Sequence, residues 1–288
     1  MSKTKILITG SGGFIASNLT RYILKNYSEY TITGIDRCDN PNLLNTVYSN
    51  KGYSFYIGDV NNSHFLHTVF ELEKPEIVIH LAYSDSDLFN FTGLQNLIKE
   101  SSINDSKLIL ISSYEVYSES FSENTETKPK TNVGLFKDAQ EKYLKLNYDK
   151  YLILRPSKVF GPKQSKDKFI PSIINACLNK QDIIIDDNHS STYSWIHVQD
   201  FCSALMSLIN KQNETYNIST NISIPNYEIV KTIENKIESL KTIFNGSRNE
   251  VVLPNTNLLK EGWLPAWKFK NGLEDTVDWY LKNKYFLK

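Results

Sequence analysis

The segment KILITGSGGFIA, residues 5–16, is the strongest indication of the fold in this chain. Residues 5–9 form a short apolar run rich in β-branched side chains, which favours a buried strand. A glycine-rich turn follows at 10–13, and a helical pattern of apolar residues continues from there to Ile23. Such a turn brings backbone N–H groups and the positive end of a helix dipole towards an anion, so the segment predicts a phosphate-binding loop.

The same alternation of strand and helix continues along the chain. Strands that alternate with helices require a parallel sheet covered on both faces, and right-handed crossovers make that sheet doubly wound. We therefore expect an α/β protein, with a Rossmann-type sheet in residues 1–156. Residues 157–288 are expected to form a smaller C-terminal α/β substrate lobe, some segments of which return to the first domain. The expected strands after the first are 31–35, 54–57, 76–80, 107–111 and 151–154, and the expected helices include 63–72, capped by Ser63, 168–179, 198–211, 226–239 and 271–282.

The composition excludes several classes of function. The 288 residues carry 32 basic and 32 acidic side chains, so no general attraction to nucleic acid or to an anionic membrane is expected. Three widely spaced cysteines and five histidines offer no convincing metal set, and the chain has no Gly-x-Ser-x-Gly hydrolase elbow. No apolar run is long enough for a membrane span. Residues 1–3 lead straight into the first strand without a signal core, which predicts a cytoplasmic protein.

The turn has further features of a dinucleotide site. Gly10, Gly13 and Ala16 occupy the three positions where a tight turn, a close approach to phosphate and close helix packing need small residues. Asp36 ends the second strand, where a carboxylate accepts hydrogen bonds from the adenosine ribose and repels a 2′-phosphate. We therefore expect NAD as the cofactor, although Arg37 beside Asp36 weakens the preference over NADP. A plain glycine-rich hairpin turn is the alternative.

An ordered set of further motifs extends over essentially the whole chain. Together they resemble the extended short-chain dehydrogenases/reductases, the group that contains nucleotide-sugar epimerases, 4,6-dehydratases and 4-reductases. The motifs are TGSGGFIA (9–16), GDV (58–60), HLA (80–82), NFTG (90–93), SSYEVY (112–117), RPSKVFGP (155–162), WIHVQD (195–200), YNIS (216–219), GW (262–263) and NGL (271–273).

The resemblance implies a cofactor site and two kinds of partner. One partner is a nucleotide-sugar substrate. The other is a second copy of the chain, packed through the helices expected at 88–101 and 133–147. Leu94, Leu97, Leu144 and Leu146 suit that dimer, but equally suit packing on the sheet. The implied cofactor-binding residues are Gly10, Gly13, Phe14, Ile15, Asp36, Arg37, Asp59, Val60, Leu81, Ala82 and Lys137.

The catalytic motif departs from the family pattern at one decisive position. The family removes a hydroxyl proton at sugar C4 with a Tyr that lies four residues before a Lys. KDAQE (137–141) matches the Lys segment, and counting back four residues gives Val133. An isopropyl group exchanges no proton, so Lys137 would either hold the ribose or accept the proton itself. As a lysine on a helix, it can also simply be a solvated side chain.

The remaining catalytic candidates follow the fifth strand. Ser113 would contribute the family's hydroxyl, or only satisfy backbone groups at the strand end. The dehydratase branch has an Asp-Glu pair where this chain has Tyr114 and Glu115. Glu115 would serve as a base, and Tyr114 would either supply the missing phenol or pack in the core. The catalytic candidates are thus Lys137, Ser113, Glu115 and Tyr114.

Two other departures affect the expected sugar site. Only seven residues separate Ala82 from Asn90, where relatives have a longer excursion. An Arg-Asp pair that helps bind the diphosphate in the family is replaced by Tyr193 and Ser194. The lysines that can substitute for that arginine, or simply form a solvated basic loop, are Lys158, Lys163, Lys166 and Lys168.

Two functions are compatible with these residues. The first is an NAD-dependent nucleotide-sugar epimerase, dehydratase or reductase with an atypical active site. The second is a catalytically degenerate relative that binds NAD(H), with or without a nucleotide-sugar, and acts as a sensor or partner subunit. Whether an ionisable group reaches the sugar C4 hydroxyl distinguishes the two.

Overall fold

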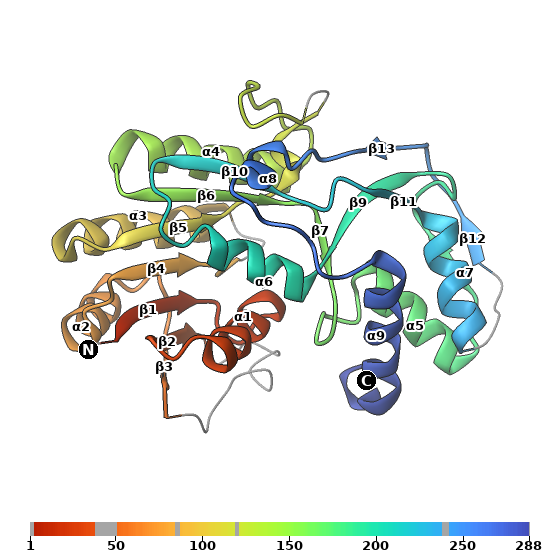
Figure 1. Cartoon of the computed structure of the whole chain (residues 1–288), viewed down its shortest axis with the longest axis horizontal. Coiled ribbons are helices and arrows are strands. Elements are labelled where there is room, and N and C mark those ends of the chain that lie inside the picture. Colours follow the sequence, from red (N-terminus) through yellow and green to blue (C-terminus); the bar gives the residue numbers. More distant parts are fainter. Residues whose placement is uncertain (1–2, 38–50, 84–86, 119–120, 238–241, 288) are drawn as a thin grey trace. The chain divides into compact units, whose positions relative to one another are not determined.

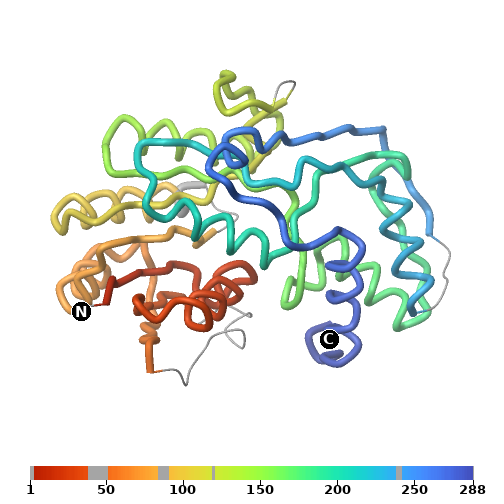
Figure 2. The backbone as a smooth tube through the Cα atoms, in the orientation of Figure 1, coloured from red at the N-terminus to blue at the C-terminus, as the bar shows by residue number. Residues whose placement is uncertain are grey.

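The computed structural model describes residues 3–37, 51–83, 87–118, 121–237 and 242–287. The chain divides into two compact units. Unit 1 comprises Met1–Arg155 with Leu208–Tyr216, and unit 2 comprises Pro156–Ser207 with Asn217–Lys288. The tube in Figure 2 can be followed from one unit to the other after Arg155, Ser207 and Tyr216.

Unit 1 is built on a sheet whose strand order is β10-β6-β5-β4-β1-β2-β3 among the described residues. The neighbouring strands from β3 across to β6 all pair in parallel, as expected for strands joined by helices. The chain order reverses between β1 and β4, which is where doubly wound sheets bind ligands. The strands are β1 (Thr4–Thr9), β2 (Tyr30–Asp36), β3 (Tyr53–Ile57), β4 (Ile77–His80), β5 (Lys107–Ile111), β6 (Tyr151–Pro156) and β10 (Glu214–Ile218), the last of which straddles the boundary between the units.

The helices of unit 1 cover both faces of this sheet. α1 (Phe14–Asn26) carries the chain from β1 to β2, whereas α2 (Ser63–Glu73), α3 (Asp87–Asn104) and α4 (Asn132–Asn147) carry it in the opposite direction along the sheet. Right-handed crossovers therefore place α1 on one face and the other three helices on the opposite face. Figure 1 shows α1 on the near side of the strands. The predicted doubly wound sheet is confirmed.

The packing of unit 1 corrects one expectation and decides between two alternatives. Ser63 is not the cap of α2, because the side chain of Asn62 accepts the hydrogen bond from Phe65 N at 3.0 Å. The two alternatives for the leucines of α3 and α4 are also resolved. Leu94, Leu97 and Leu144 have no exposed surface and pack with Val78 and Leu108 in the core, while Leu146 is 84% exposed.

Unit 2 contains short strands with helices against them. β9 is central to one sheet, since it pairs with β7, β11 and β13, and β8 pairs with β12. The core packs α5, α7 and α9 against the side of β9 that carries Tyr193 and Trp195. The elements are β7 (Lys158–Phe160), α5 (Phe169–Asn179), β8 (Ile183–Ile185), β9 (Thr192–His197), α6 (Val198–Ser207), β11 (Ser223–Pro225), α7 (Asn226–Lys236), β12 (Thr242–Phe244), β13 (Glu250–Val251), α8 (Thr256–Lys260), α9 (Phe269–Lys282) and the short 3₁₀ helix η3 (Lys284–Leu287).

The helix expected at 198–211 is shorter in the structure. α6 ends at Ser207, and residues 208–210 form a turn in which Lys211 N donates to Leu208 O. An apolar run thus continues beyond the helix because Leu208 and Ile209 are buried in the turn itself. The apolar residues of this turn continue the sequence pattern of the helix, and for that reason the predicted helix was too long at its C-terminal end.

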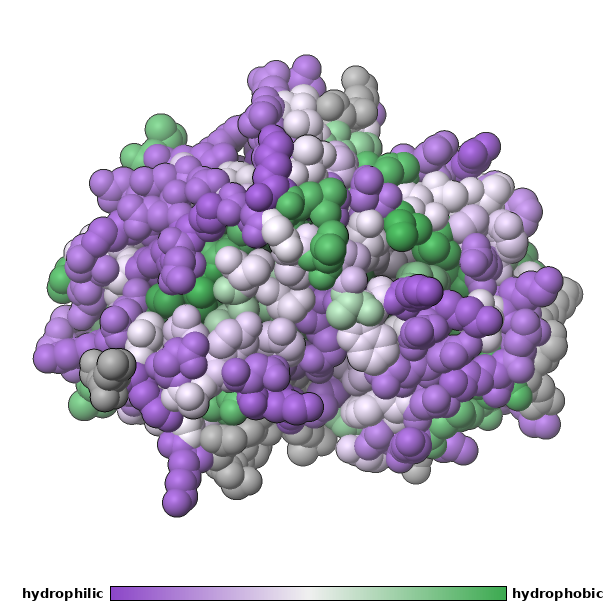
Figure 3. All heavy atoms as spheres, in the orientation of Figure 1, coloured by the Kyte–Doolittle hydropathy of each residue, from purple (hydrophilic) through white to green (hydrophobic). Residues whose placement is uncertain are grey.

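The surface gives few further indications of partners. On the face drawn in Figure 3, hydrophobic residues lie in separate patches among hydrophilic ones, which is normal for a globular protein. No helix in the described part of the chain is both long and apolar enough to cross a membrane. Within the same residues, no group of three or more His, Cys, Asp or Glu side chains is placed to hold a metal ion.

Candidate active site

The glycine turn lies between β1 and the start of α1. Gly10 has φ +69°, and a Cβ there would lie 2.8 Å from the backbone of Ala82. Gly13 is the N-cap of α1, and no side chain caps the helix. The first turn of α1, which begins with the half-buried Phe14 and Ile15, contains no acidic residue. The free helix terminus and the absence of Cβ atoms make this turn a good fit for a pyrophosphate.

Ala16 and Ser11 complete the description of the turn. Ala16 is 1% exposed, so its small side chain allows α1 to pack closely. The Ser11 hydroxyl is buried and makes no hydrogen bond to the described residues. An unsatisfied buried hydroxyl is costly unless a ligand or water pairs with it, which also suits a polar ligand at this turn.

The Asp36 carboxylate is tied to the same turn from the end of β2. One oxygen accepts a hydrogen bond from Gly12 N at 2.7 Å, and the other accepts from Arg37 N at 2.8 Å. Asp36 is buried and Arg37 is half-buried. A carboxylate held in this way still has acceptor capacity for ribose hydroxyl groups.

Asp59 and Val60 follow β3. Asp59 accepts hydrogen bonds at 2.8 Å from both the backbone N–H and the side-chain amide of Asn61. Val60 is buried, and a Cβ on Gly93 would lie only 2.7 Å from its side chain. The sequence GDV thus forms a fixed turn against α3.

The end of β4 brings His80, Leu81 and Ala82 against the end of β1. His80 Nδ1 lies 2.8 Å from the Thr9 hydroxyl, and Ala82 N donates to the same hydroxyl at 3.3 Å. Burial, assisted by the charge of Lys137, lowers the pKa of His80 to about 3, so its ring is neutral. The short loop that follows falls largely outside the described residues, which exclude 84–86.

Lys137 belongs to α4, and its side chain reaches the end of β5. It is 9% exposed, and its ammonium donates to Ile111 O at 2.9 Å. Burial lowers the pKa of Lys137 to about 8, against the opposing effect of the Glu141 carboxylate. The ammonium also lies 5.6 Å from the centre of the Tyr83 ring. Lys137 is therefore a buried cation that can lose its proton near neutral pH, and not a solvated helix lysine.

Glu141 fixes α4, the helix of Lys137, to the sheet. Its carboxylate accepts hydrogen bonds from Arg155 Nε, at 2.9 and 3.2 Å, from Arg155 Nη2 at 2.5 Å, and from the hydroxyl of Ser112. Arg155 also donates to the Tyr117 hydroxyl at 2.6 Å. This buried network was not among the sequence candidates, although its members flank the catalytic motifs.

The three candidates after β5 lie at the 3₁₀ helix η2 (Tyr114–Val116). Ser113 caps this helix by accepting a hydrogen bond from Glu115 N at 3.2 Å. Glu115 accepts from the Thr131 hydroxyl at 2.6 Å, and Tyr114 is half-buried. Ser113 therefore has the structural role that was its alternative, which does not prevent its hydroxyl from donating to a ligand.

Val133 is half-buried in the first turn of α4, one turn before Lys137. The next residue explains how closely this turn approaches η2. A Cβ on Gly134 would lie 2.2 Å from Glu115 O, so only glycine fits there. The geometry of the turn is thus set by Gly134, whereas nothing in the structure explains the valine.

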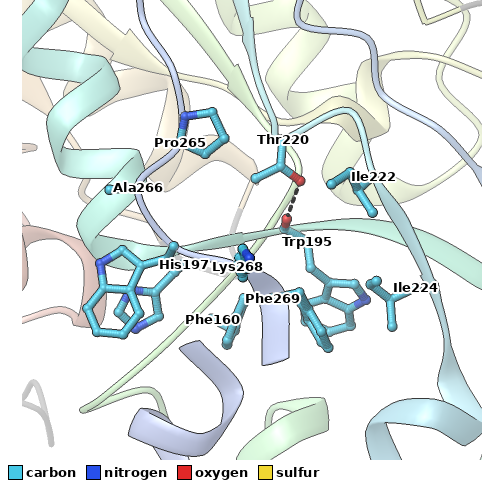
Figure 4. A pocket seen from close by; sticks show the side chains of 11 residues that line it. Phe160, Trp195, His197, Thr220, Ile222, Ile224, Pro265, Ala266, Lys268 and Phe269 are labelled. Atoms are coloured by element: carbon cyan, nitrogen blue, oxygen red, sulfur yellow. Dashed lines mark hydrogen bonds between the residues drawn. The ribbon is translucent and has the colours of Figure 1, made fainter. Parts of the chain in front are cut away.

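Unit 2 contains a pocket of its own, shown in Figure 4. The volume is about 280 Å³, and aromatic and aliphatic side chains form most of the walls. The two ring nitrogens of the buried His197 and the indole N–H of Trp195 make no hydrogen bond to the described residues. Thr220 donates to Trp195 O at 3.1 Å. The lining residues are Phe160, Trp195, His197, Thr220, Ile222, Ile224, Pro265, Ala266, Trp267, Lys268 and Phe269.

The positions expected to hold a diphosphate have an unusual arrangement. Tyr193 is buried, and its hydroxyl donates to Asp187 at 2.7 Å. The ammonium of Lys158 lies 3.6 Å from the centre of the Tyr193 ring, a cation–π contact. Of the other lysines proposed there, Lys166 and Lys168 are exposed. Lys158 therefore lies against Tyr193, which occupies the position of the expected diphosphate-binding arginine.

The model of the NAD dependent epimerase/dehydratase family matches residues 6–219. The chain belongs to this family. The match confirms the resemblance stated from the sequence motifs, since it covers the glycine turn, Lys137 and β9. It assigns the family, but gives no role to an individual side chain.

Relatives of this family agree in fold along nearly the whole chain. dTDP-D-glucose 4,6-dehydratase of Mus musculus is 28% identical, over 97% of this chain and 89% of that protein. The crystal structure of dTDP-glucose 4,6-dehydratase from Bacillus anthracis in complex with NAD has a TM-score of 0.92 at 25% identity, covering 99% of this chain and 100% of that one. UDP-glucose 4-epimerase from Thermotoga maritima, at 21% identity, shares the fold with a TM-score of 0.86, covering 98% and 100%.

Proposed function

We propose that this chain is an NAD-dependent oxidoreductase of a nucleotide-sugar, with an altered proton-transfer site. The observation that carries the proposal is Lys137, whose buried ammonium is fixed at the carboxyl end of β5. Burying a lysine is costly, and such groups are concentrated at functional sites. Relatives named dTDP-glucose 4,6-dehydratase and UDP-glucose 4-epimerase support a nucleotide-sugar as the substrate.

The cofactor would be held by residues from four strand ends. Gly10, Gly13 and the N-terminus of α1 would bind the pyrophosphate, with Phe14 and Ile15 beside it. Asp36 and Arg37 would contact the adenosine ribose. Bound NAD would supply a hydride acceptor for the substrate carbon. The other residues that would line the cofactor are Asp59 and Val60 at the adenine, Leu81 and Ala82 at the end of β4, and Lys137 at the nicotinamide ribose.

Proton transfer would rely on groups other than residue 133. With a pKa of about 8, Lys137 would be mostly protonated at neutral pH. Its ammonium would then stabilise an anion beside it, and its small unprotonated fraction could accept a hydroxyl proton directly. Ser113 would donate a hydrogen bond to the substrate oxygen. In a dehydratase, Glu115 would remove the C5 proton, and Tyr114 would stand where the branch has its acid. The relatives named as dehydratases favour this branch over the epimerases.

The pocket of unit 2 would bind part of the nucleotide-sugar. Its aromatic and aliphatic walls suit a flat ring or the apolar face of a sugar. Lys158 would supply a positive charge for the diphosphate where the expected arginine is absent. Lys268 at the pocket adds a second cation.

The catalytically degenerate relative remains the second candidate function. Val133 favours it, because loss of a general acid/base typically costs a factor of about 10² to 10⁴ in rate.

The homodimer also remains a prediction. Three of its four leucines are buried within the protomer; among the described side chains of α3 and α4, Leu146, Leu135 and Ile103 are exposed apolar residues. The cytoplasmic location stays a prediction from the sequence.

The test combines cofactor binding with product analysis. The purified protein is titrated with NAD and NADP by calorimetry, and then incubated with NAD and a panel of dTDP-, UDP-, GDP- and CDP-sugars in D₂O. Mass spectrometry should show loss of water, or uptake of deuterium, for one sugar, and Lys137→Met should abolish it. If NAD binds but no sugar changes, the degenerate relative is the correct assignment.

A further inference from the structure

The loss of the phenol at position 133 directs attention to other phenols near Lys137. The strand pairs His80↔Leu110 and Ile79↔Ile109 place the ends of β4 and β5 side by side. Lys137 donates to Ile111 O, so its ammonium lies at the end of β5. Any side chain that leaves the end of β4 in the same direction comes close to this ammonium.

Tyr83 leaves the end of β4 in this way. Its backbone follows Ala82, which is held by the hydrogen bond to the Thr9 hydroxyl and by the close approach to Gly10. The Tyr83 ring centre then lies 5.6 Å from Lys137 Nζ. The consecutive residues Thr9 and Gly10 therefore hold Ala82, the residue before Tyr83, and Lys137 lies beside the ring.

The exposures of the two groups differ in a useful way. Tyr83 is 48% exposed, whereas Lys137 is 9% exposed. A ligand can therefore reach the phenol, while the ammonium is buried beside it. A positive charge within about 6 Å favours the anionic form of a neighbouring acid, which is what a phenol needs in order to accept a proton. The nearby His80 is neutral and adds no competing charge.

We propose that Tyr83 replaces the missing phenol as the acid/base that exchanges a proton with the substrate hydroxyl, with Lys137 as its stabilising cation. This role rests on the proposed function. The hydroxyl O–H bond breaks and its proton joins the phenolate oxygen of Tyr83. The C–H bond on the same carbon gives its electron pair as hydride to oxidised NAD, and a C=O bond forms. The reverse transfer returns both.

The first readout needs neither cofactor nor substrate. Tyrosine ionisation is followed by ultraviolet difference spectroscopy in the wild type and in Tyr83→Phe. We expect the wild type to contain one phenol that ionises before the others, absent from Tyr83→Phe and shifted to higher pH in Lys137→Met. Tyr285→Phe, which removes a 60% exposed phenol near the C-terminus, should retain it. Identical titrations of the wild type and Tyr83→Phe would overturn the pairing.

The second readout is turnover of the sugar identified above. Tyr83→Phe should lower kcat by a factor of about 10² to 10⁴ and leave the Kd for NAD unchanged. Val133→Tyr introduced into Tyr83→Phe should restore part of the rate, because it returns a phenol one helical turn from Lys137. A ring that merely fills space predicts full activity in Tyr83→Phe, since Phe retains the ring.

The outcomes separate this role from the function on which it rests. An active wild type with an equally active Tyr83→Phe variant overturns only the role of Tyr83. Loss of activity in Tyr114→Phe together with an unaffected Tyr83→Phe assigns the proton transfer to Tyr114. A wild type that binds NAD but converts no sugar overturns both the proposed function and this role.

Discussion

Replacing Lys137 by Met should change how the free energy of unfolding depends on pH. The pKa of this lysine is about 8 in the folded protein and 10.5 when the side chain is solvated. Because the folded pKa is the lower one, the unfolded chain binds more protons between these two values. The free energy of unfolding of the wild type therefore rises with pH from about 8 to about 10.5.

The size of the effect follows from the same two values. At about 1.4 kcal/mol per pH unit, the rise amounts to about 3 kcal/mol. Lys137→Met removes this gain and also the hydrogen bond to Ile111 O, which contributes about 1.5 to 3 kcal/mol. At pH 7 the lost bond offsets the relief of a buried charge, so the two proteins should have similar stability there. Above pH 10 the wild type should be clearly the more stable.

Urea unfolding at a series of pH values measures the difference. Lys107 has a pKa lowered by burial to about 8 as well, but it is present in both proteins and cancels. Lys142→Met is the matched control on the same helix, because Lys142 is 60% exposed and paired with Asp138. The free energies of unfolding of the wild type and of Lys137→Met could instead change in parallel from pH 7 to 10.5. That result would show that Lys137 is not held as a buried cation.

Three further results are expected. Gly10→Ala should lower the affinity for NAD, measured by calorimetry, by about tenfold or more, because the added Cβ collides with the backbone of Ala82. Gly262→Ala is the control, because Gly262 also has a positive φ but has open space around it; it shows the effect of backbone strain without a collision. Glu141→Gln should cost about 3 to 5 kcal/mol in urea unfolding by leaving the buried Arg155 without its carboxylate, and a loss below 1 kcal/mol would contradict this. His197→Phe should raise the melting temperature and lessen the fall in stability between pH 6.5 and 4, since burial lowers the pKa of His197 to about 4 and the folded state favours the neutral ring; the buried His80 causes a further fall that is common to both proteins, and an unchanged acid dependence would count against the prediction.

Local patterns predicted the first unit well because its interactions are local or repetitive. The run of residues 5–9, the glycines at 10–13 and Asp36 specify a strand, a turn and a strand end almost independently of the rest of the chain. The family match over residues 6–219 confirms the resemblance drawn from these motifs. The choice between two adjacent capping residues was harder to predict. Asn62 and Ser63 are both good N-caps, and the geometry of α2 selects Asn62.

The residues of the candidate site were likewise predictable from the sequence only in part. The sequence places Lys137 four residues after Val133, so the missing phenol follows from counting alone. The contact between Lys137 and Tyr83 does not, because 54 positions separate them and neither residue matches a motif that includes the other. The nearest signal was the position of Tyr83 directly after HLA at a strand end.

The amino-acid sequence by itself determined the α/β fold, the glycine turn and the class of cofactor chemistry, since these depend on periodicity and on residue types at short spacing. The three-dimensional packing was needed to show which leucines are buried, that Lys137 is shielded from solvent, and that Tyr83, three residues beyond the end of β4, lies beside it. Burial and the proximity of distant residues arise when strands pair and helices pack on the sheet, and no local pattern encodes those contacts.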